Sequence, residues 1–282
     1  GAGLVHAYVA APGIAAVQQG APQAIALPWP SLPDADHTVA EAAESVTHAR
    51  TGAPSTPWGD ALAIGPGLGR SPASLALLQH ALEHALHPNA GRAMVLDADA
   101  LTLATIVGEL AGDKREPADI IAQWTLGAGQ VMLTPHPGEF ARLIGKPVPA
   151  DWSHRAGELV SFAIRTRASV LLKGTPTLVA TPDGAPPTVV ARGTALLATG
   201  GSGDLLTGII AGLLAGGLDA RDAAILGATV HGLGAEIATR GTSIRGLTLE
   251  AVLASLPDAW RELAHPATFH KDVLSEFPKP VG

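Results

Sequence analysis

Short apolar runs alternate along the chain with longer stretches in which apolar residues recur at helical spacing. The short runs are bounded by Gly or Pro and predict strands at Val5–Ala10, Ala61–Gly65, Ala93–Asp97, Val131–Thr134 and Val170–Lys173. The longer stretches predict helices, namely one that starts at Ser71-Pro72, then Arg155–Arg167, Leu205–Ala215, Arg221–Thr239 and Leu249–Leu263. This alternation is typical of an α/β fold in which helices cover both faces of a mostly parallel sheet.

One section of the chain departs from the alternation. Leu178–Ala180 and Thr188–Ala191 predict two strands, and the turn sequence Thr181-Pro-Asp-Gly184 between them predicts a β-hairpin near the end of the sheet. The polar connection Gly112–Trp124 carries no clear periodicity and receives no assignment.

Composition narrows the class of protein. The 282 residues are 47% hydrophobic and 15% charged, which suffices for a sizeable core. The net charge of −7, without any basic cluster, argues against nucleic acid or an anionic membrane as the main partner. Cysteine is absent, which excludes thiolate catalysis, and no apolar run reaches the length of a membrane span. We expect a cytoplasmic protein with one domain over residues 1–265 and an irregular, proline-containing tail over Pro266–Gly282.

The chemically unusual residues follow the ends of the predicted strands. The four segments are Gly65-Pro-Gly67-Leu-Gly69, Asp97-Ala-Asp99, Thr134-Pro-His136-Pro-Gly-Glu139 and Lys173-Gly174. Because the carboxyl ends of parallel strands form one edge of a sheet, where ligands bind, we expect these segments to lie together.

Each segment also has a purely structural interpretation. The glycine-rich segment fits either a tight turn or the close approach of a ligand. Asp97 fits a turn or cap, or a carboxylate that orients a substrate hydroxyl or holds Mg²⁺ through water, whereas Asp99 favours a cap. His136, fixed between two prolines, fits a structural residue or a ligand contact, and with Glu139 it is too small a set for a metal site. Lys173 fits a phosphate contact or a lysine that snorkels to solvent.

The segment Thr199-Gly-Gly-Ser-Gly-Asp204 lies directly before a strongly apolar helix, in which Gly208 and Gly212 are expected to allow close packing. The first turn of that helix presents unpaired N–H groups and a positive dipole end, and the glycines leave them accessible to an anion. Ser202 fits a cap or an added hydroxyl. Asp204 fits a residue that stabilises the dipole, or a base that takes a proton from an attacking hydroxyl.

The common nucleotide-binding loops and the nucleophile elbow are absent from the sequence, namely G-x-x-x-x-G-K-[ST], G-x-G-x-x-G after the first strand and G-x-S-x-G. A phosphoryl-transfer site of a different design is therefore the remaining interpretation.

Six segments together resemble a known family. They are AIGPGLGRSP, VLDADAL, LTPHPGEFARL, VLLKGTPTLVATPDG, ATGGSGDLLTGIIAGLLAGG and ATVHGLGAE. In their order and spacing, over roughly residues 1 to 263, they are similar to the ADP- or ATP-dependent NAD(P)H-hydrate dehydratases of the ribokinase-like superfamily. GGSGD marks the superfamily, whereas PHPGE together with GPGLG and LKG-x-x-T is more specific to the dehydratases. The resemblance implies a three-layer α/β/α fold with a mostly parallel central sheet.

The resemblance also implies a reaction and its residues. ADP or ATP, with Mg²⁺, would phosphorylate the 6-hydroxyl of hydrated NADH or NADPH, and loss of phosphate would restore the cofactor. Asp204 would be the catalytic base, and the anion hole would comprise Gly201, Ser202 and Gly203. The nucleotide would be bound by Lys173, Gly174, Thr175, Pro176, Thr177 and Gly203. The substrate site would comprise Gly67, His136, Asp97, Glu139 and Asp204, and no residue is assigned to a metal.

Members of this family are expected to form homo-oligomers and to be fused to or paired with an epimerase domain. They usually begin with a further strand and a Gly-rich loop before the segment that matches Gly1–Val5, and from the resemblance we expect both to be missing from residues 1–282. Two alternative functions stay open. Another ribokinase-like small-molecule kinase would release a stable phosphorylated product, and a catalytically silent nucleotide-binding module would bind ADP without turnover.

Overall fold

The computed structural model describes residues 4–28, 60–85, 93–112, 114–126, 130–240 and 248–264. Its strands are β1 (His6–Val9), β2 (Ile25–Pro28), β3 (Ala61–Ile64), β4 (Ala93–Leu96), β5 (Gln130–Leu133), β6 (Ser169–Leu172), β7 (Thr177–Ala180) and β8 (Thr188–Val190). Its helices are α1 (Ile14–Gly20), α3 (Pro72–Ala85), α4 (Asp99–Ala111), α5 (Pro117–Trp124), α6 (Pro137–Ile144), α7 (Trp152–Thr166), α8 (Ser202–Ala215), α9 (Ala220–Ala238) and α10 (Leu249–Ala264). Two short 3₁₀ turns, η1 (Ala11–Gly13) and η3 (Ala195–Leu197), complete the described elements.

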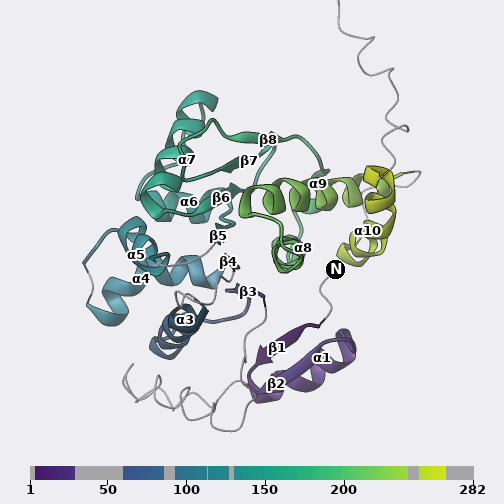
Figure 1. The fold of residues 1–282 in the computed structure, drawn as a ribbon, viewed down its shortest axis with the longest axis horizontal. Coiled ribbons are helices and arrows are strands. Elements are labelled where there is room, and N and C mark those ends of the chain that lie inside the picture. The colour runs from purple at the N-terminus through teal and green to yellow at the C-terminus, as the bar shows by residue number, and fades with distance from the viewer. Residues whose placement is uncertain are drawn as a thin grey trace, which may run out of the picture. The chain divides into compact units, whose positions relative to one another are not determined.

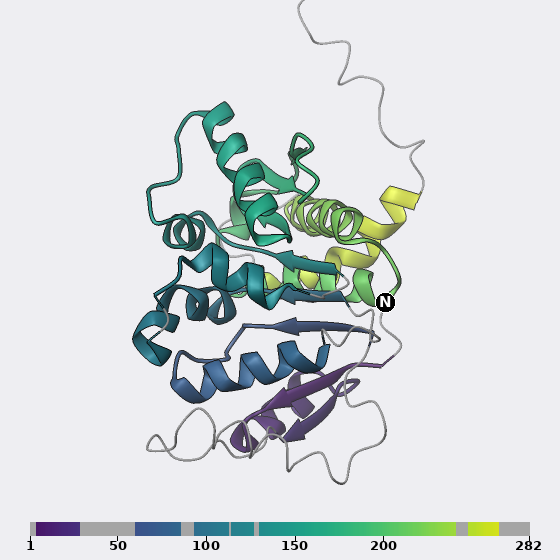
Figure 2. The same ribbon diagram turned by 60° about the vertical axis from the view of Figure 1, so that its left-hand side comes forward.

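Strands β3 to β8 form one six-stranded sheet in the order β3-β4-β5-β6-β7-β8 (Figure 1). β3 to β6 are parallel, and in their register Ile64 lies opposite Leu96, which lies opposite Leu133. β7 runs antiparallel to β6, and β8 antiparallel to β7. The mostly parallel sheet and the hairpin predicted from the sequence are therefore confirmed. Figure 2 shows α3 running alongside β3, both in blue.

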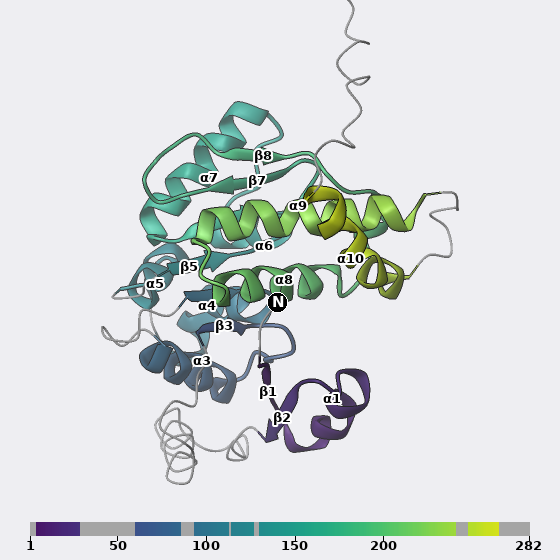
Figure 3. The ribbon, with the colours of Figure 1, turned by 45° about the vertical axis from the view of Figure 1, so that its right-hand side comes forward.

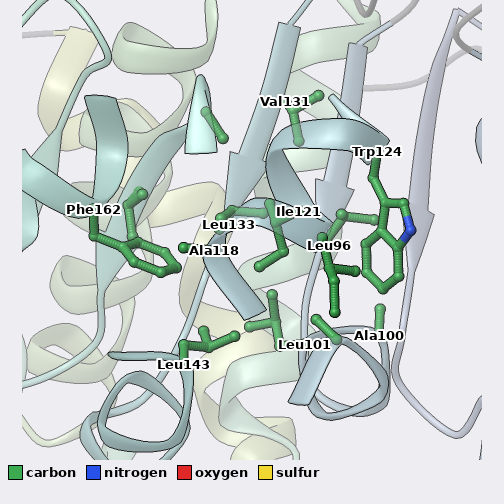
Figure 4. Packing of buried hydrophobic residues seen from close by; sticks show 14 of the residues in the cluster. Leu96, Ala100, Leu101, Ala118, Ile121, Trp124, Val131, Leu133, Leu143 and Phe162 are labelled. Atoms are coloured by element: carbon green, nitrogen blue, oxygen red, sulfur yellow. The ribbon is translucent and has the colours of Figure 1, made fainter. Parts of the chain in front are cut away.

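Successive residues of the central strands point to opposite faces of the sheet, so each strand contributes to two cores. On β4, Met94 and Leu96 belong to the larger core, whereas Val95 belongs to the smaller one. The larger core is closed by α3, α4, α5, α6 and α7, whose buried side chains pack against the strands. Figure 4 shows this packing for side chains of α4, α5, α6 and α7. In this core the rings of Phe140 and Phe162 meet edge to face, with their centroids 5.3 Å apart.

The smaller core is closed by α8 and the first half of α9. The buried apolar side chains of α8 lie one turn apart, at Leu206, Ile210 and Leu214. Figure 3 shows α8 and α9 side by side, and Gly227 of α9 makes this possible because a β-carbon there would lie 2.7 Å from Ile210 Cγ1. Among the residues that the structure describes, a β-carbon at Gly208 or Gly212 would meet nothing within 4 Å, so the close packing expected at these two glycines is not seen there.

The described residues group into two compact units, 4–191 with 203–228, and 192–202 with 229–264. Within the first unit, β1 and β2 pair in parallel as a separate two-stranded sheet, connected by η1 and α1. Within the second unit, α9 and α10 approach closely, because a β-carbon at Gly234 would lie 3.0 Å from Leu256 Cδ2. None of the described helices is both long and apolar enough to cross a membrane.

The predicted strands and helices are present, with small shifts of their ends. The sequence interpretation missed β2, α1, α4 and α6, and the unassigned connection Gly112–Trp124 contains α5. Residues 1–3 and the tail Pro266–Gly282 lie outside the described residues. The single domain over residues 1–265 and the irregular tail therefore stay predictions.

Candidate active site

The carboxyl ends of β3 to β6 are joined by main-chain hydrogen bonds. The N–H of Asp97 donates to the last carbonyl of β3 over 3.1 Å, and that of Thr134 to the last carbonyl of β4 over 3.2 Å. The N–H of Lys173 donates to the carbonyl of Pro135 over 2.9 Å. The strand-end segments therefore lie together at one edge of the sheet, as the sequence predicts.

Asp97 and Lys173 form an ion pair at this edge. Lys173 Nζ donates to Asp97 Oδ1 over 2.9 Å, and the side chains are 21% and 1% exposed, respectively. The other carboxylate oxygen, Asp97 Oδ2, accepts a hydrogen bond of 2.7 Å from Thr207 Oγ1 on α8. Both oxygens of Asp97 are thus engaged by protein groups, while the side chain of Lys173 is partly exposed.

The start of α8 lies against this ion pair. A β-carbon at Gly203 would lie 3.1 Å from Lys173 Nζ and 3.8 Å from Asp97 Oδ2, so glycine lets the ammonium approach the first turn of the helix. The next residue, Asp204, is exposed. Partial desolvation and the negative charge of Asp97 raise the pKa of Asp204, against the opposing effect of Lys173. A carboxylate with a raised pKa is a stronger proton acceptor, which suits a general base.

The turn after β3 requires glycine at its first position. Gly65 has φ of +135°, and a β-carbon there would lie 1.7 Å from the carbonyl oxygen of Asp97. Gly67, with φ of +69°, is exposed and has open space around it. The turn is therefore structural at Gly65 and accessible to a ligand at Gly67.

Asp99 holds the rest of this glycine-rich turn. It lies in the first turn of α4, where a negative charge is favourable, rather than at the N-cap position itself. Its Oδ2 accepts from the N–H of Gly69 over 3.0 Å, and its Oδ1 accepts from Arg70 Nε over 2.7 Å. The side chain thus ties the turn after β3 to the helix after β4, which the sequence did not predict.

His136 and Glu139 form a capping box at the start of α6. His136 Nδ1 accepts from the N–H groups of Gly138 and Glu139 over 3.0 and 3.3 Å, and Glu139 Oε2 accepts from the N–H of His136 over 2.8 Å. Half of the His136 side chain is exposed, whereas Glu139 is buried. The structural interpretation therefore holds for Nδ1, and the exposed part of the ring is what a ligand can reach.

The segment Lys173–Thr177 forms a turn between β6 and β7. Gly174 and Thr175 are exposed, Pro176 is partly buried and follows a cis peptide bond, and Thr177 Oγ1 donates to the carbonyl of Gly174 over 3.1 Å. Exposed main chain next to an ammonium is suited to a phosphorylated ligand.

Gly201 and Ser202 fall in the second unit and have partners there. Gly201 has φ of +83°, and a β-carbon there would lie 3.2 Å from Leu249 Cδ2. Ser202 is buried, and its Oγ lies 3.3 Å from Nε2 of the buried His231. The hydroxyl of Ser202 thus has a side-chain partner, and its N–H group donates to the carbonyl of Thr199 over 3.2 Å.

Two partners of predicted residues were missed in the sequence, Thr207 in the first unit and His231 in the second. Thr207 lies three residues after Asp204 on α8, a spacing that places both on one side of a helix and could have identified it. His231 belongs to the segment ATVHGLGAE, which contributed to the resemblance without a role of its own.

Comparisons with known proteins agree on one family. The sequence model of the NAD(P)H-hydrate dehydratase family matches residues 1–257. A bifunctional NAD(P)H-hydrate repair enzyme of Moorella thermoacetica is 40% identical over 205 residues, which are 72% of this chain and 35% of that protein. The ADP-dependent (S)-NAD(P)H-hydrate dehydratase of Bacillus subtilis is 36% identical over 71% of this chain and 64% of its own length.

A solved structure from the same organism gives a similar result. The ADP/ATP-dependent NAD(P)H-hydrate dehydratase of Bacillus subtilis, crystallised with ATP and Mg²⁺, superposes with a TM-score of 0.68 at 29% identity. That match covers 93% of this chain and 80% of the other, and it confirms the ribokinase-like α/β fold. The chain spans about a third of the length of the bifunctional relatives that it matches. By its sequence and its fold, the chain belongs to the NAD(P)H-hydrate dehydratase family.

Proposed function

We propose that this chain is an ADP- or ATP-dependent dehydratase that restores NADH or NADPH from the (6S)-hydrated form. In the first step the terminal phosphoryl group of the nucleotide would pass to the 6-hydroxyl, whose proton would go to the Asp204 carboxylate. In the second step the C6–O bond would break and phosphate would leave with its electron pair. The C5 proton would pass to the departing phosphate, and the electrons of the C5–H bond would re-form the dihydronicotinamide double bond. Atoms and charges balance without any other reactant.

The observation that carries this proposal is the position of Lys173. Its ammonium lies against Gly203, one residue before a carboxylate whose pKa is raised. A phosphate held there would meet a cation and a base together, which is the requirement for transfer to a hydroxyl.

The remaining roles follow the family. The proposed anion site comprises Gly201, Ser202 and Gly203, of which Ser202 already donates its N–H to the carbonyl of Thr199. Gly174, Thr175, Pro176 and Thr177 are proposed to line the nucleotide beside Lys173. Gly67, His136, Glu139 and Asp97 are proposed to shape the site of the hydrated dinucleotide, with the first two accessible and the last two buried.

Mg²⁺ belongs to this proposal as a companion of the nucleotide. Among the residues that the structure describes, no group of three or more His, Asp or Glu side chains could hold a metal ion. Mg²⁺ in nucleotide enzymes is commonly held by one or two carboxylates together with substrate phosphates, where it neutralises phosphate charge. Both oxygens of Asp97 are already engaged and Asp204 is the proposed base, so Mg²⁺ would be held mainly by the phosphates of the nucleotide.

The cellular setting is also proposed. A cytoplasmic location and assembly into a homo-oligomer are proposed from the resemblance alone. Association with an epimerase domain is supported by relatives described as bifunctional NAD(P)H-hydrate repair enzymes.

The decisive experiment is an assay with enzymatically hydrated NADH and NADPH. Purified protein with Mg²⁺ is expected to release the reduced cofactor only when ADP or ATP is present, as followed by absorbance of the dihydronicotinamide. An unchanged hydrate would contradict the proposal. A stable phosphorylated product would instead identify a small-molecule kinase, and ADP binding without turnover would identify a silent module.

A further inference from the structure

Thr207 is a buried polar residue to which the proposed reaction gives no role. It is 2% exposed, and its Oγ1 donates to Asp97 Oδ2 over 2.7 Å. The bond joins residues 110 positions apart in the sequence and connects α8 to the end of β4. Because Asp204 lies one turn before Thr207, the same bond fixes the helix that carries the proposed base.

The bond also determines how Asp97 holds Lys173. Asp97 is 1% exposed, so its two oxygens depend on donors from the protein. Lys173 supplies one donor to Oδ1, and Thr207 satisfies Oδ2. An ammonium has three donors, so the bond to Asp97 leaves two N–H groups of Lys173 that a ligand can use.

We propose that Thr207 is a positioning residue for nucleotide phosphate. By occupying Oδ2 it limits Asp97 to one hydrogen bond with Lys173, so the ammonium remains free to contact the phosphates of a nucleoside di- or triphosphate. Without the hydroxyl, the buried Oδ2 would lack a donor, and the nearest charged one is Lys173. The ammonium would then be drawn across both carboxylate oxygens and away from the phosphates of the nucleotide.

This inference rests on the proposed function only in taking a nucleotide as the ligand. Thr207→Val removes the hydroxyl while keeping the shape of the side chain. The variant is expected to bind ADP about tenfold more weakly, or about 1.4 kcal/mol, in isothermal titration. Adenosine, which has no phosphate to contact Lys173, is expected to bind the variant as it binds the wild type. With hydrated cofactor as substrate, KM for the nucleotide should rise more than kcat falls.

Two variants separate positioning from a loss of stability. Thr207→Ser keeps the hydroxyl and should restore ADP affinity. Thr166→Val is the matched control, because Thr166 is fully buried on α7 and its hydroxyl donates to the carbonyl of Phe162 over 2.8 Å. It should lower Tm as Thr207→Val does, without changing ADP affinity relative to adenosine.

The proposal is overturned if Thr207→Val binds ADP as the wild type does, or loses ADP and adenosine equally. Should that variant not fold, Thr207→Ala is measured against the same two ligands, with the same expectation and the same contrary results. A wild type that binds ADP but leaves the hydrate unchanged would contradict the proposed function, and the ADP–adenosine comparison would still decide the role of Thr207. A wild type that binds neither ADP nor ATP would overturn both.

Discussion

At the scale of single residues, the site depends on how neighbouring charges change the pKa of the Asp204 carboxyl group. Asp97 and partial desolvation raise the pKa of Asp204, and Lys173 only partly opposes them. Because the proposed base must be ionised to accept a proton, the acid limb of the pH–rate profile is expected above the ordinary Asp value of 3.8.

Asp204→Asn tests whether Asp204 is the catalytic base and whether its negative charge destabilises the folded protein. We expect turnover to fall by about 10²- to 10⁴-fold, the usual loss of a general base, while ADP binding is kept. When the pKa of a carboxyl group is higher in the folded than in the unfolded protein, the protonated group stabilises the fold. This stabilisation is complete below the unfolded-state pKa and is lost as the pH rises through the folded-state pKa. At neutral pH the charged group therefore destabilises the native state, and the variant should melt at or above the wild-type Tm, with the difference closing towards pH 4.

Asp183→Asn is the control, because the pKa of Asp183 is shifted in the opposite direction and the expected change in Tm is therefore opposite. The pKa of Asp183 is lowered by the hydroxyl of Thr181 and the N–H of Ala185, so its contribution to stability is present at neutral pH and lost on acidification. This variant should melt below the wild type at pH 7 and keep full turnover. If the two variants shifted Tm in the same direction, the electrostatic account of Asp204 would be wrong.

Gly65 gives a second residue-scale prediction. Gly65→Ala would place a β-carbon 1.7 Å from the carbonyl oxygen of Asp97, in a backbone conformation with φ of +135°. We expect a loss of about 3 kcal/mol or more in the free energy of unfolding, measured by denaturant titration. Gly112→Ala is the control, because φ is +69° there and nothing lies within 4 Å, so only about 1 kcal/mol of strain is expected. Equal losses would contradict the close approach of β3 and β4 at this point.

At the scale of elements, α6 starts with an uncommon N-cap residue, His136, whose imidazole ring is also proposed to contact the substrate. His136→Ala should remove the cap and lower stability by about 1 kcal/mol, and it should also weaken substrate binding if the exposed part of the ring contacts the substrate. His136→Asn restores a good capping acceptor without the ring. It should therefore recover Tm and leave KM for the hydrate raised.

A variant at another helix start separates these effects. Asp151 caps α7 by accepting from the N–H of His154 over 2.9 Å, and Asp151→Ala should lower Tm without changing KM. If His136→Asn restored KM as well as Tm, His136 would act only as a cap.

Sequence patterns predicted most elements, and the failures have physical causes. The hairpin followed from the Thr181–Gly184 turn, and the parallel strands followed from short apolar runs. α4 was missed because a helix buried on most sides has no clear 3.6-residue period, and α6 because it is short and starts with a histidine cap. In the site, strand ends predicted that Asp97 and Lys173 would be close. No local pattern shows that Thr207 takes the second oxygen of Asp97, because that contact depends on how α8 packs on the sheet.

At the scale of the whole molecule, an acidic chain is proposed to bind an acidic ligand. With a net charge of −7, binding must rely on local positive potential at Lys173 and α8. ADP at 100 times its Kd should stabilise the native state by about 2.7 kcal/mol, which for a chain of this size raises Tm by about 5 to 10 °C. Differential scanning calorimetry can measure the shift, and added salt should reduce it. A Tm that does not depend on ADP concentration would contradict nucleotide binding.

The distance in sequence between Asp97 and Thr207 has a consequence for how the protein is made. A ribosome adds roughly 5 to 20 residues per second, so the 110 residues between the two take about 5 to 20 s to emerge. Until α8 has been synthesised, the carboxylate at the end of β4 lacks its second donor and is best kept in water. In a nascent chain that stops before α8, the Asp97 carboxylate should therefore stay hydrated. It should become buried only after α8 has been synthesised and has packed on the sheet.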